Sequence, residues 1–234
     1  MKENAERTNK VSLRGKISSD FQFSHKSNGV CYYIANIDLE RTSGYIDCIP
    51  VMVSQYIGHL PEKGSVVCIK GQCQSANKVI DGQRKLLLNV SALEVKAWDK
   101  RSEDIDKNHI YLNGYICKEP LYRVTPLGRS ISDVCIAVNS SQNHSDYLPC
   151  IFWGSNAKIV SNLPVGCQIK IWGRIQSRQY FKKIELDAGG QADGGSQKAE
   201  EKLEGRTAYE VSVTRIKCVL CHIPDREKPV PGNF

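Results

Sequence analysis

The stretch Leu60-Pro-Glu-Lys-Gly-Ser-Val-Val-Cys-Ile-Lys-Gly-Gln-Cys-Gln-Ser75 recurs as Leu163-Pro-Val-Gly-Cys-Gln-Ile-Lys-Ile-Trp-Gly-Arg-Ile-Gln-Ser177. Each copy opens with Leu-Pro and contains two glycines seven residues apart, and an apolar run rich in β-branched residues lies between them. Such a run is typical of a buried strand, and a glycine inside it indicates a bulge or bend. This stretch therefore predicts a sharply curved β-sheet that occurs twice.

Two further blocks recur in the same order. Asn9-Lys-Val-Ser-Leu-Arg-Gly-Lys-Ile17 matches Asn108-His-Ile-Tyr-Leu-Asn-Gly-Tyr-Ile116, and Asp47-Cys-Ile-Pro50 matches Asp146-Tyr-Leu-Pro149, both at an offset of 99 residues. Three blocks in one order predict a duplication of a module of about 90–100 residues, a usual domain size.

Each module is predicted to be a small all-β barrel. Apolar residues alternate at Val11, Leu13 and Ile17, as in a half-buried strand. The only helical candidates are short, Ser54–His59 and Ser155–Ser161, and each lies between the third and fourth predicted strands. Five strands with a short helix at that point describe the OB-fold, a Greek-key barrel. We therefore predict an all-β protein of two tandem five-stranded OB-folds, each with a short helix.

Composition sets the predicted boundaries. The first OB-fold covers 9–95 after a flexible N-terminus (1–8), and a charged linker (96–107) leads to the second OB-fold (108–218). Within the second copy, residues 187–205 are Gly-rich and then charged, which predicts a mobile loop. The segment 219–234 contains three prolines and is predicted to be a flexible tail.

Charge and hydropathy limit the classes of function. The 234 residues are 41% hydrophobic and carry a net charge of +7, which permits a polyanionic partner without proving one. No run of 18 apolar residues occurs, so no membrane span is predicted. The polar start, Met1 to Lys10, is unlike a secretory signal peptide, and we expect a cytoplasmic, nucleoid-associated protein.

The cysteines and histidines do not predict a metal or catalytic site. Cys218-Val-Leu-Cys221-His222 has metal-ligand spacing, but a structural zinc site needs four ligands and no second pair appears; the alternative is a strand end followed by a mobile tail. Most other cysteines, Cys167 included, are interpreted as small buried hydrophobes with free thiols. No metalloprotease motif, phosphate-binding glycine loop or nucleophile elbow occurs. We therefore predict no enzyme, no metal and no cofactor.

Basic and aromatic residues interleave in the second copy, most densely in Trp172-Gly-Arg-Ile-Gln-Ser-Arg-Gln-Tyr-Phe-Lys-Lys183. Cations for phosphates beside flat rings for bases are what single-strand binding requires. Alternation assigns Phe152 to the interior and Trp153 to the opposite face, whereas Trp172 fits either environment. The predicted contacts with single-stranded DNA are Tyr122, Arg123, Arg129, Tyr147, Trp153, Trp172, Arg174, Arg178, Tyr180, Phe181, Lys182 and Lys183.

The second copy resembles the bacterial single-stranded DNA-binding proteins. The resemblance rests on the stretch from Asn108 to Gly128, then Ile136-Ala-Val-Asn139, the segment from Asp146 to Gly154, and Gly173-Arg-Ile-Gln-Ser-Arg-Gln-Tyr180. The whole chain resembles a tandem OB-fold variant of clostridial-type bacteria. The resemblance implies sequence-independent binding and protection of single-stranded DNA in replication, recombination and repair, mainly by the second OB-fold. It also implies base stacking on Tyr147, Trp153 and Tyr180.

The sequence departs from the family pattern at three places. Gln142 stands where the family often has a further stacking Trp, and the C-terminal segment has little acid to recruit partners. In the first copy, the residues aligned with the stacking rings are Cys48, Ser54 and Lys78. We therefore expect the first copy to make barrel-to-barrel contacts and only secondary contacts with single-stranded DNA, through Lys70, Lys78, Arg84 and Lys85.

Family resemblance also predicts the assembly and leaves alternatives open. Single-OB members form tetramers, so a tandem chain is expected to reach four barrels as a homodimer, with replication or repair proteins as further partners. The rival interpretation is an OB-fold module that binds protein, such as a primosome or mobile-element accessory protein. An RNA-binding OB protein is a third, because stacking and cationic grooves hardly separate RNA from DNA.

Overall fold

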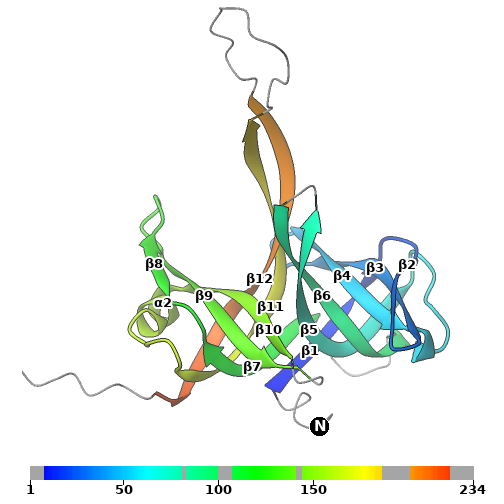
Figure 1. Ribbon diagram of the computed structural model, residues 1–234, viewed down its shortest axis with the longest axis horizontal. Coiled ribbons are helices and arrows are strands. Elements are labelled where there is room, and N and C mark those ends of the chain that lie inside the picture. The colour runs from blue at the N-terminus through cyan, green and yellow to red at the C-terminus, as the bar shows by residue number, and fades with distance from the viewer. Residues whose placement is uncertain (1–7, 81–82, 100–106, 141–143, 186–200, 222–234) are drawn as a thin grey trace, which may run out of the picture.

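The computed structural model describes residues 8–80, 83–99, 107–140, 144–185 and 201–221, which form two β-barrels side by side (Figure 1). Each barrel comes from one sequence repeat. The first contains β1 (Asn9–Ile17), β2 (Gln22–Ser27), β3 (Val30–Glu40), β4 (Ile46–Ser54), the 3-10 turn η1 (Gln55–Ile57), β5 (Val66–Ile80) and β6 (Gln83–Ala97). The second contains β7 (Asn108–Ile116), β8 (Leu121–Val124), β9 (Ser130–Asn139), β10 (Ser145–Trp153), the helix α2 (Gly154–Val160), β11 (Gln168–Glu185) and β12 (Glu201–Leu220).

Five strands close each barrel. In the first repeat the order is β3-β4-β6-β5-β1, and β1 returns to pair with β3; in the second it is β9-β10-β12-β11-β7, and β7 pairs with β9. The pairs β4–β6 and β10–β12 are parallel, and the other pairs are antiparallel. The additional strands β2 and β8 form hairpins with β3 and β9 outside the closed barrel. The all-β prediction of two five-stranded OB-folds is confirmed, with the short helices at the predicted places.

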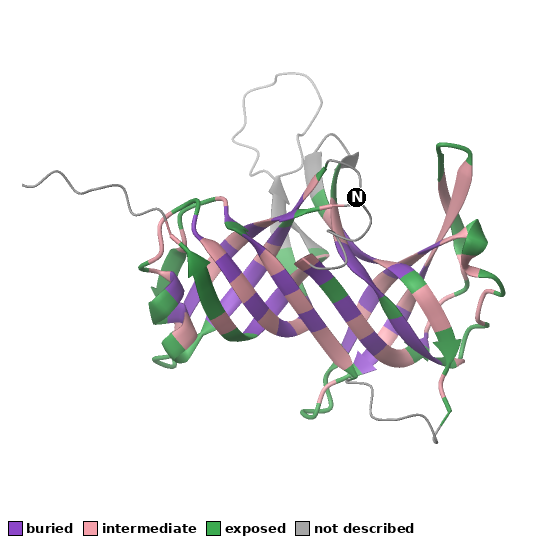
Figure 2. Cartoon of the chain, turned by 90° about the horizontal axis from the view of Figure 1, so that it is seen from below, coloured by how far each residue is buried: buried purple, intermediate pink, exposed green. Residues whose placement is uncertain are grey.

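The curvature of the barrels depends on glycine. Gly71 and Gly173 lie at register shifts in β5 and β11, where a Cβ atom would collide with the carbonyl oxygens of Ser91 and Ser212. A side chain at either place would therefore push the paired strands apart. Inside each barrel, alternate strand residues are buried, including Leu13, Ile37, Leu112 and Phe152 (Figure 2).

The two barrels share one continuous sheet through the antiparallel pairing of β1 with β7. Val11 lies opposite Ile110, and Asn9 and Leu13 lie opposite Leu112 and Asn108. Val11 and Ile110 are equivalent residues of the two repeats, so the pairing is symmetric about this point. The repeats are therefore related by a local two-fold axis, as two subunits of a C₂ dimer would be.

Side-chain hydrogen bonds across the junction repeat the same symmetry. The Ser177 N–H donates to Asp47 Oδ1 and the Ser75 N–H donates to Asp146 Oδ1, each at 2.7 Å. Both carboxylates are buried, at 0% and 4% exposure. The aspartate and serine of the recurring sequence blocks thus join the two barrels, and the long hairpins β5–β6 and β11–β12 rise from this junction (Figure 1).

The symmetry is broken by Arg41, which forms a bidentate ion pair with Asp47. Arg41 Nε lies 2.6 Å from Oδ2 and Nη2 lies 2.5 Å from Oδ1. The hydrogen bond to Asp47 raises the pKa of Arg41. Asp146 has no ion-pair partner among the described residues, and burial raises its pKa. One aspartate is therefore neutralised by a cation and its equivalent is not.

The ends of the second barrel differ from the sequence prediction. Strand β12 begins at Glu201, within the predicted loop 187–205, and extends to Leu220, within the predicted tail 219–234. Gln168 pairs with Leu220, which brings the start of β11 to the end of β12 and allows Cys167 to form a disulfide with Cys221. The interpretation of Cys167 as a free thiol is wrong, because its partner is 54 residues away in sequence.

The remaining predicted flexible segments lie largely or wholly outside the described residues: 1–8, most of 96–107 and 222–234. Across the described part of the chain, no helix combines the length and hydropathy needed to cross a bilayer. The same part contains no group of three or more His, Cys, Asp or Glu arranged to hold a metal ion.

Candidate nucleic-acid interface

A groove of about 1210 Å³ runs over the outer face of the second barrel. Its walls come from the β8–β9 hairpin, the end of β10, the start of α2 and the facing parts of β11 and β12. Among the predicted contact residues, it brings together Arg123, Arg129, Trp153, Arg174 and Arg178. The predicted residues thus contribute one aromatic ring and four arginines to the groove.

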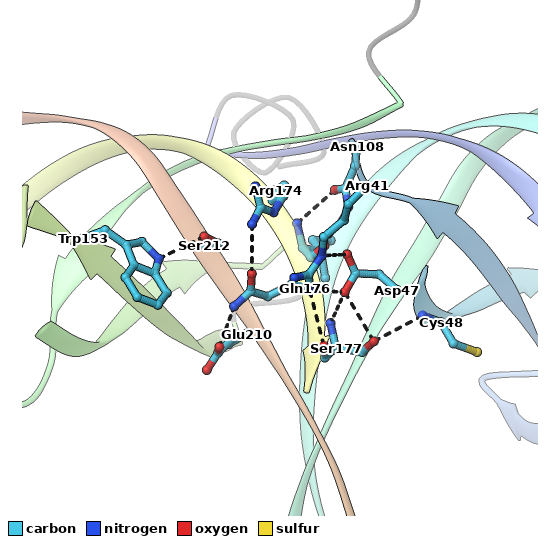
Figure 3. A network of polar contacts seen from close by, with 11 residues as sticks. Arg41, Asp47, Cys48, Asn108, Trp153, Arg174, Gln176, Ser177, Glu210 and Ser212 are labelled. Carbon is cyan, nitrogen blue, oxygen red and sulfur yellow. Dashed lines mark hydrogen bonds and ion pairs between the residues drawn. The ribbon is translucent and has the colours of Figure 1, made fainter. Parts of the chain in front are cut away.

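Strand alternation places Trp153 in this groove. Phe152 points into the core with 0% exposure, as the sequence predicted, so Trp153 points outward and is 39% exposed. The indole Nε1 donates to Ser212 Oγ at 3.2 Å (Figure 3). This bond fixes one edge of the ring in the groove while part of its surface stays accessible, which suits a base-stacking residue.

The arginines of the groove differ in how they are held. Arg123 Nε donates to Asp133 at 2.9 Å, whereas Arg174 Nη2 donates to Gln176 Oε1 at 3.4 Å. Gln176 in turn donates to Glu210 at 2.7 Å (Figure 3). Arg174 Nε is buried without a hydrogen-bond partner among the described residues. The protein groups around Arg174 therefore leave one of its donors without an acceptor.

Two further predicted rings flank the groove. Tyr180 lies on the same alternating face of β11 as Arg178, whose guanidinium carbon is 5.6 Å from the ring centroid. Tyr147 is 49% exposed on the outward face of β10, and its N–H donates to Ser75 Oγ at 2.8 Å. Six residues along one strand separate Tyr147 from Trp153, about 20 Å. The exposed rings therefore follow the strands over a length of several nucleotides.

Other predicted contact residues lie elsewhere. Trp172 packs against Tyr111 on the outer side of β7 and β11, with Arg215 3.9 Å from its ring centroid. Tyr122 bonds to Ser130 on the side of β8 away from Arg123. Phe181 alternates with Tyr180, which directs it to the opposite face of β11, and is 74% exposed.

Of the secondary contacts predicted in the first barrel, Lys70 forms an ion pair with Glu94 at 3.5 Å. The side chains of Lys78, Arg84, Lys85, Lys182 and Lys183 lie outside the described residues.

The equivalent face of the first barrel lacks the charge of the groove. Taking Gly71 and Gly173 as equivalent, Gln72 and Ala76 stand where the second barrel has Arg174 and Arg178. Ser54 stands where the second barrel has Trp153. Tyr32 of β3 lies opposite Ser54 in the β3–β4 pair. Its ring stacks on that of His25, with the ring centroids 4.9 Å apart. At these equivalent positions, the arginines and the tryptophan are therefore found only on the second barrel.

Two of the basic and aromatic residues that line the groove were missed by the sequence analysis, and both come from the first repeat. Arg41 and Tyr45, in the turn between β3 and β4, reach across the junction and line the groove beside Ser177. No sequence motif marks them, since their position depends on how the barrels pack.

Known proteins are similar in sequence to the second repeat. Residues 107–187 match the single-strand binding protein family. The chain is 32% identical over 80 residues to single-stranded DNA-binding protein A of Bacillus subtilis (strain 168). The match covers 31% of this chain and 46% of that protein. The chain is 34% identical over an equal length to single-stranded DNA-binding protein 1 of Staphylococcus aureus (strain COL), covering 48% of that protein. The chain thus spans about half the length of these relatives.

Structural similarity extends over both barrels. The wild-type single-stranded DNA-binding protein of Thermus aquaticus superposes with a TM-score of 0.66 at 19% identity, covering 91% of this chain and 93% of that one. A deletion mutant of the same Thermus aquaticus protein gives a TM-score of 0.64 at 20% identity, covering 94% of this chain and 98% of that one. At this identity the likeness establishes the tandem fold. Through residues 107–187, the chain is similar in sequence to the single-strand binding protein family.

Proposed function

We propose that the protein binds single-stranded DNA without sequence preference, mainly through the groove of the second barrel. The observation that supports this most directly is the edge-anchored, outward-facing ring of Trp153 among four arginines. Aromatic rings stack on any base and arginines contact any phosphate. The combination therefore favours binding of single strands whatever their sequence. The names of the similar bacterial proteins agree with this function.

The test is a fluorescence titration in which Trp153 is the only tryptophan. Replacing Trp98 and Trp172 by Phe leaves one fluorophore in the groove. Quenching by oligo-dT but not by duplex DNA is expected, because a base stacked on indole quenches it and paired bases are not available to stack. Equal quenching by oligo-U would favour the RNA-binding alternative, and no response to any oligonucleotide would favour a protein-interaction module.

In the cell, we expect this activity to operate in the cytoplasm on exposed single strands, which the protein would protect during replication, recombination and repair. No catalytic chemistry is required for that role. Replication or repair proteins are its expected partners.

We also propose a homodimer, which would bring four barrels together. Exposed apolar side chains on the first barrel support a further contact surface, including Phe23 at 60% and Leu93 at 55% exposure. Two-fold assembly is the commonest closed oligomer. Light scattering on the full chain should give twice the chain mass, and a monomer at micromolar concentration would contradict the proposal.

A further inference from the structure

The turn between the first barrel's β3 and β4 is held rigidly at the edge of the second barrel's groove. Within the turn, the Arg41 N–H donates to the Tyr45 carbonyl at 2.8 Å and the Gly44 N–H donates to the Arg41 carbonyl at 2.9 Å. Gly44 has φ +80°, a conformation that suits glycine. The backbone of the turn is thus closed by its own hydrogen bonds.

The Arg41 side chain ties this turn to the second barrel. Its guanidinium pairs with Asp47, and Nη2 also reaches the Ser177 carbonyl at 3.4 Å (Figure 3). Asp47 itself accepts the Ser177 N–H, so these three residues form one network across the junction. Since Asp47 already neutralises Arg41, the guanidinium serves as a positioning group rather than as a free cation for phosphate.

The ring that Arg41 positions is Tyr45. The guanidinium carbon lies 4.5 Å from the Tyr45 ring centroid, and the side chain remains 44% exposed. Tyr45 lines the same groove as Trp153. Figure 3 shows Ser212, Glu210 and Gln176, which also line the groove, between Trp153 and Arg41. One aromatic ring from each repeat therefore faces a single groove.

We propose that Tyr45 is a base-stacking residue that the first repeat contributes to the single-strand groove of the second. The inference rests on the proposed function, and it makes the groove incomplete without the first repeat. The contribution runs in one direction, because Ser140 and His144 occupy the positions equivalent to Arg41 and Tyr45. A strand bound at Trp153 would continue across the junction onto Tyr45.

The test compares oligo-dT binding of full-length variants. Tyr45→Ala should weaken affinity about 5- to 150-fold, the usual range for one base–ring stack. Tyr45→Phe keeps the ring and should restore most of that loss. Tyr56→Ala is the matched control, because Tyr56 is 73% exposed on the same barrel but does not line the groove. Unchanged affinity in Tyr45→Ala, or an equal loss in Tyr56→Ala, overturns the proposal.

Photo-crosslinking separates direct stacking from a structural effect. Oligo-dT containing 5-iododeoxyuridine should crosslink to peptides that contain Tyr45 and Trp153. Crosslinks at Trp153 alone would overturn the role of Tyr45 and leave the proposed function intact. Failure of the parent to bind or crosslink any oligonucleotide would instead refute the proposed function, on which the role of Tyr45 depends.

Discussion

Asp47 and Asp146 occupy equivalent buried places and accept equivalent N–H groups, yet they have different electrostatic surroundings. Asp47 is ion-paired with Arg41, so removing its charge leaves a half-buried guanidinium without a counter-ion. Burial raises the pKa of Asp146, which means that folding disfavours its ionised form. The same substitution should therefore have opposite effects at the two positions.

We predict that Asp47→Asn lowers the free energy of unfolding by about 2–3 kcal/mol at pH 7. Asp146→Asn should raise it by up to about 1 kcal/mol at pH 7, because the ionised carboxylate no longer has to be buried. Folding raises the pKa of Asp146, so ionisation of this carboxyl lowers the free energy of unfolding. This loss of stability develops as the pH rises through the pKa of the folded state. The gain in Asp146→Asn should therefore vanish below about pH 4, where the unfolded state is also protonated. Urea unfolding of both variants at pH 7 and pH 4 measures these changes. Equal changes in the free energy of unfolding from the two substitutions would contradict the argument.

Stacking is also a residue-scale property. Trp153→Ala and Tyr180→Ala should each weaken oligo-dT binding by about 1–3 kcal/mol, since each removes one ring from the path of the strand. Fluorescence anisotropy of a labelled oligonucleotide measures this without relying on tryptophan. The control is Tyr115→Ala, an exposed ring on β7 that does not line the groove. Parental affinity in both the Trp153 and the Tyr180 variant would mean that these rings do not contact bases.

At the scale of the element, the outward face of β11 passes through two environments along its length. Arg174 and Arg178 line the groove, whereas Trp172 lies outside it and packs against Arg215 of β12. The register shift between Trp172 and Gly173 lies where these two environments meet. Cationic residues on the same hairpin therefore differ in whether they line the groove.

The salt dependence of oligo-dT binding distinguishes the arginines that line the groove from the basic residues outside it. Each phosphate contact contributes about −0.7 to the slope of log K against log salt for single strands. The double variant Arg174→Gln, Arg178→Gln should make the slope shallower by about 1. Removal of the same charge from outside the groove, with Arg215→Gln and Lys217→Gln, should leave the slope close to that of the parent. Equal changes in both would show that the groove does not define the cationic path.

The Cys167–Cys221 disulfide links the start of β11 to the end of β12 and closes a loop of 54 residues. A cross-link of this length stabilises a fold by about 2–4 kcal/mol. We predict that Cys221→Ser lowers the unfolding free energy by this amount under oxidising conditions, and that reductant removes the difference from the parent. The matched control is Cys218→Ser, which removes a free, exposed thiol 3.2 Å from the Cys221 sulfur. Equal stability of the parent with and without reductant would contradict this role.

At the scale of the whole molecule, sequence reasoning succeeded where information is local or periodic. Alternation identified Phe152 as core and Trp153 as exposed, and the repeated glycines predicted the curled strands. Alternation did not mark β2 and β8, because their side chains are mostly exposed. Arg41, Tyr45 and the Cys167–Cys221 pair were also missed, since each acquires its partner only when distant segments pack.

The local two-fold axis at Val11 and Ile110 relates two stretches of one gene rather than two copies of one subunit. In a symmetric homodimer, every mutation appears on both sides of the axis, so a change that suits one side is imposed on the other. In this chain, a single mutation changes only one side of the axis. That freedom allowed Arg41 and Tyr45 to arise opposite a partner with Ser140 and His144, and Trp153 opposite Ser54. Covalent fusion thus let the two halves evolve different tasks while the axis that joins them was kept.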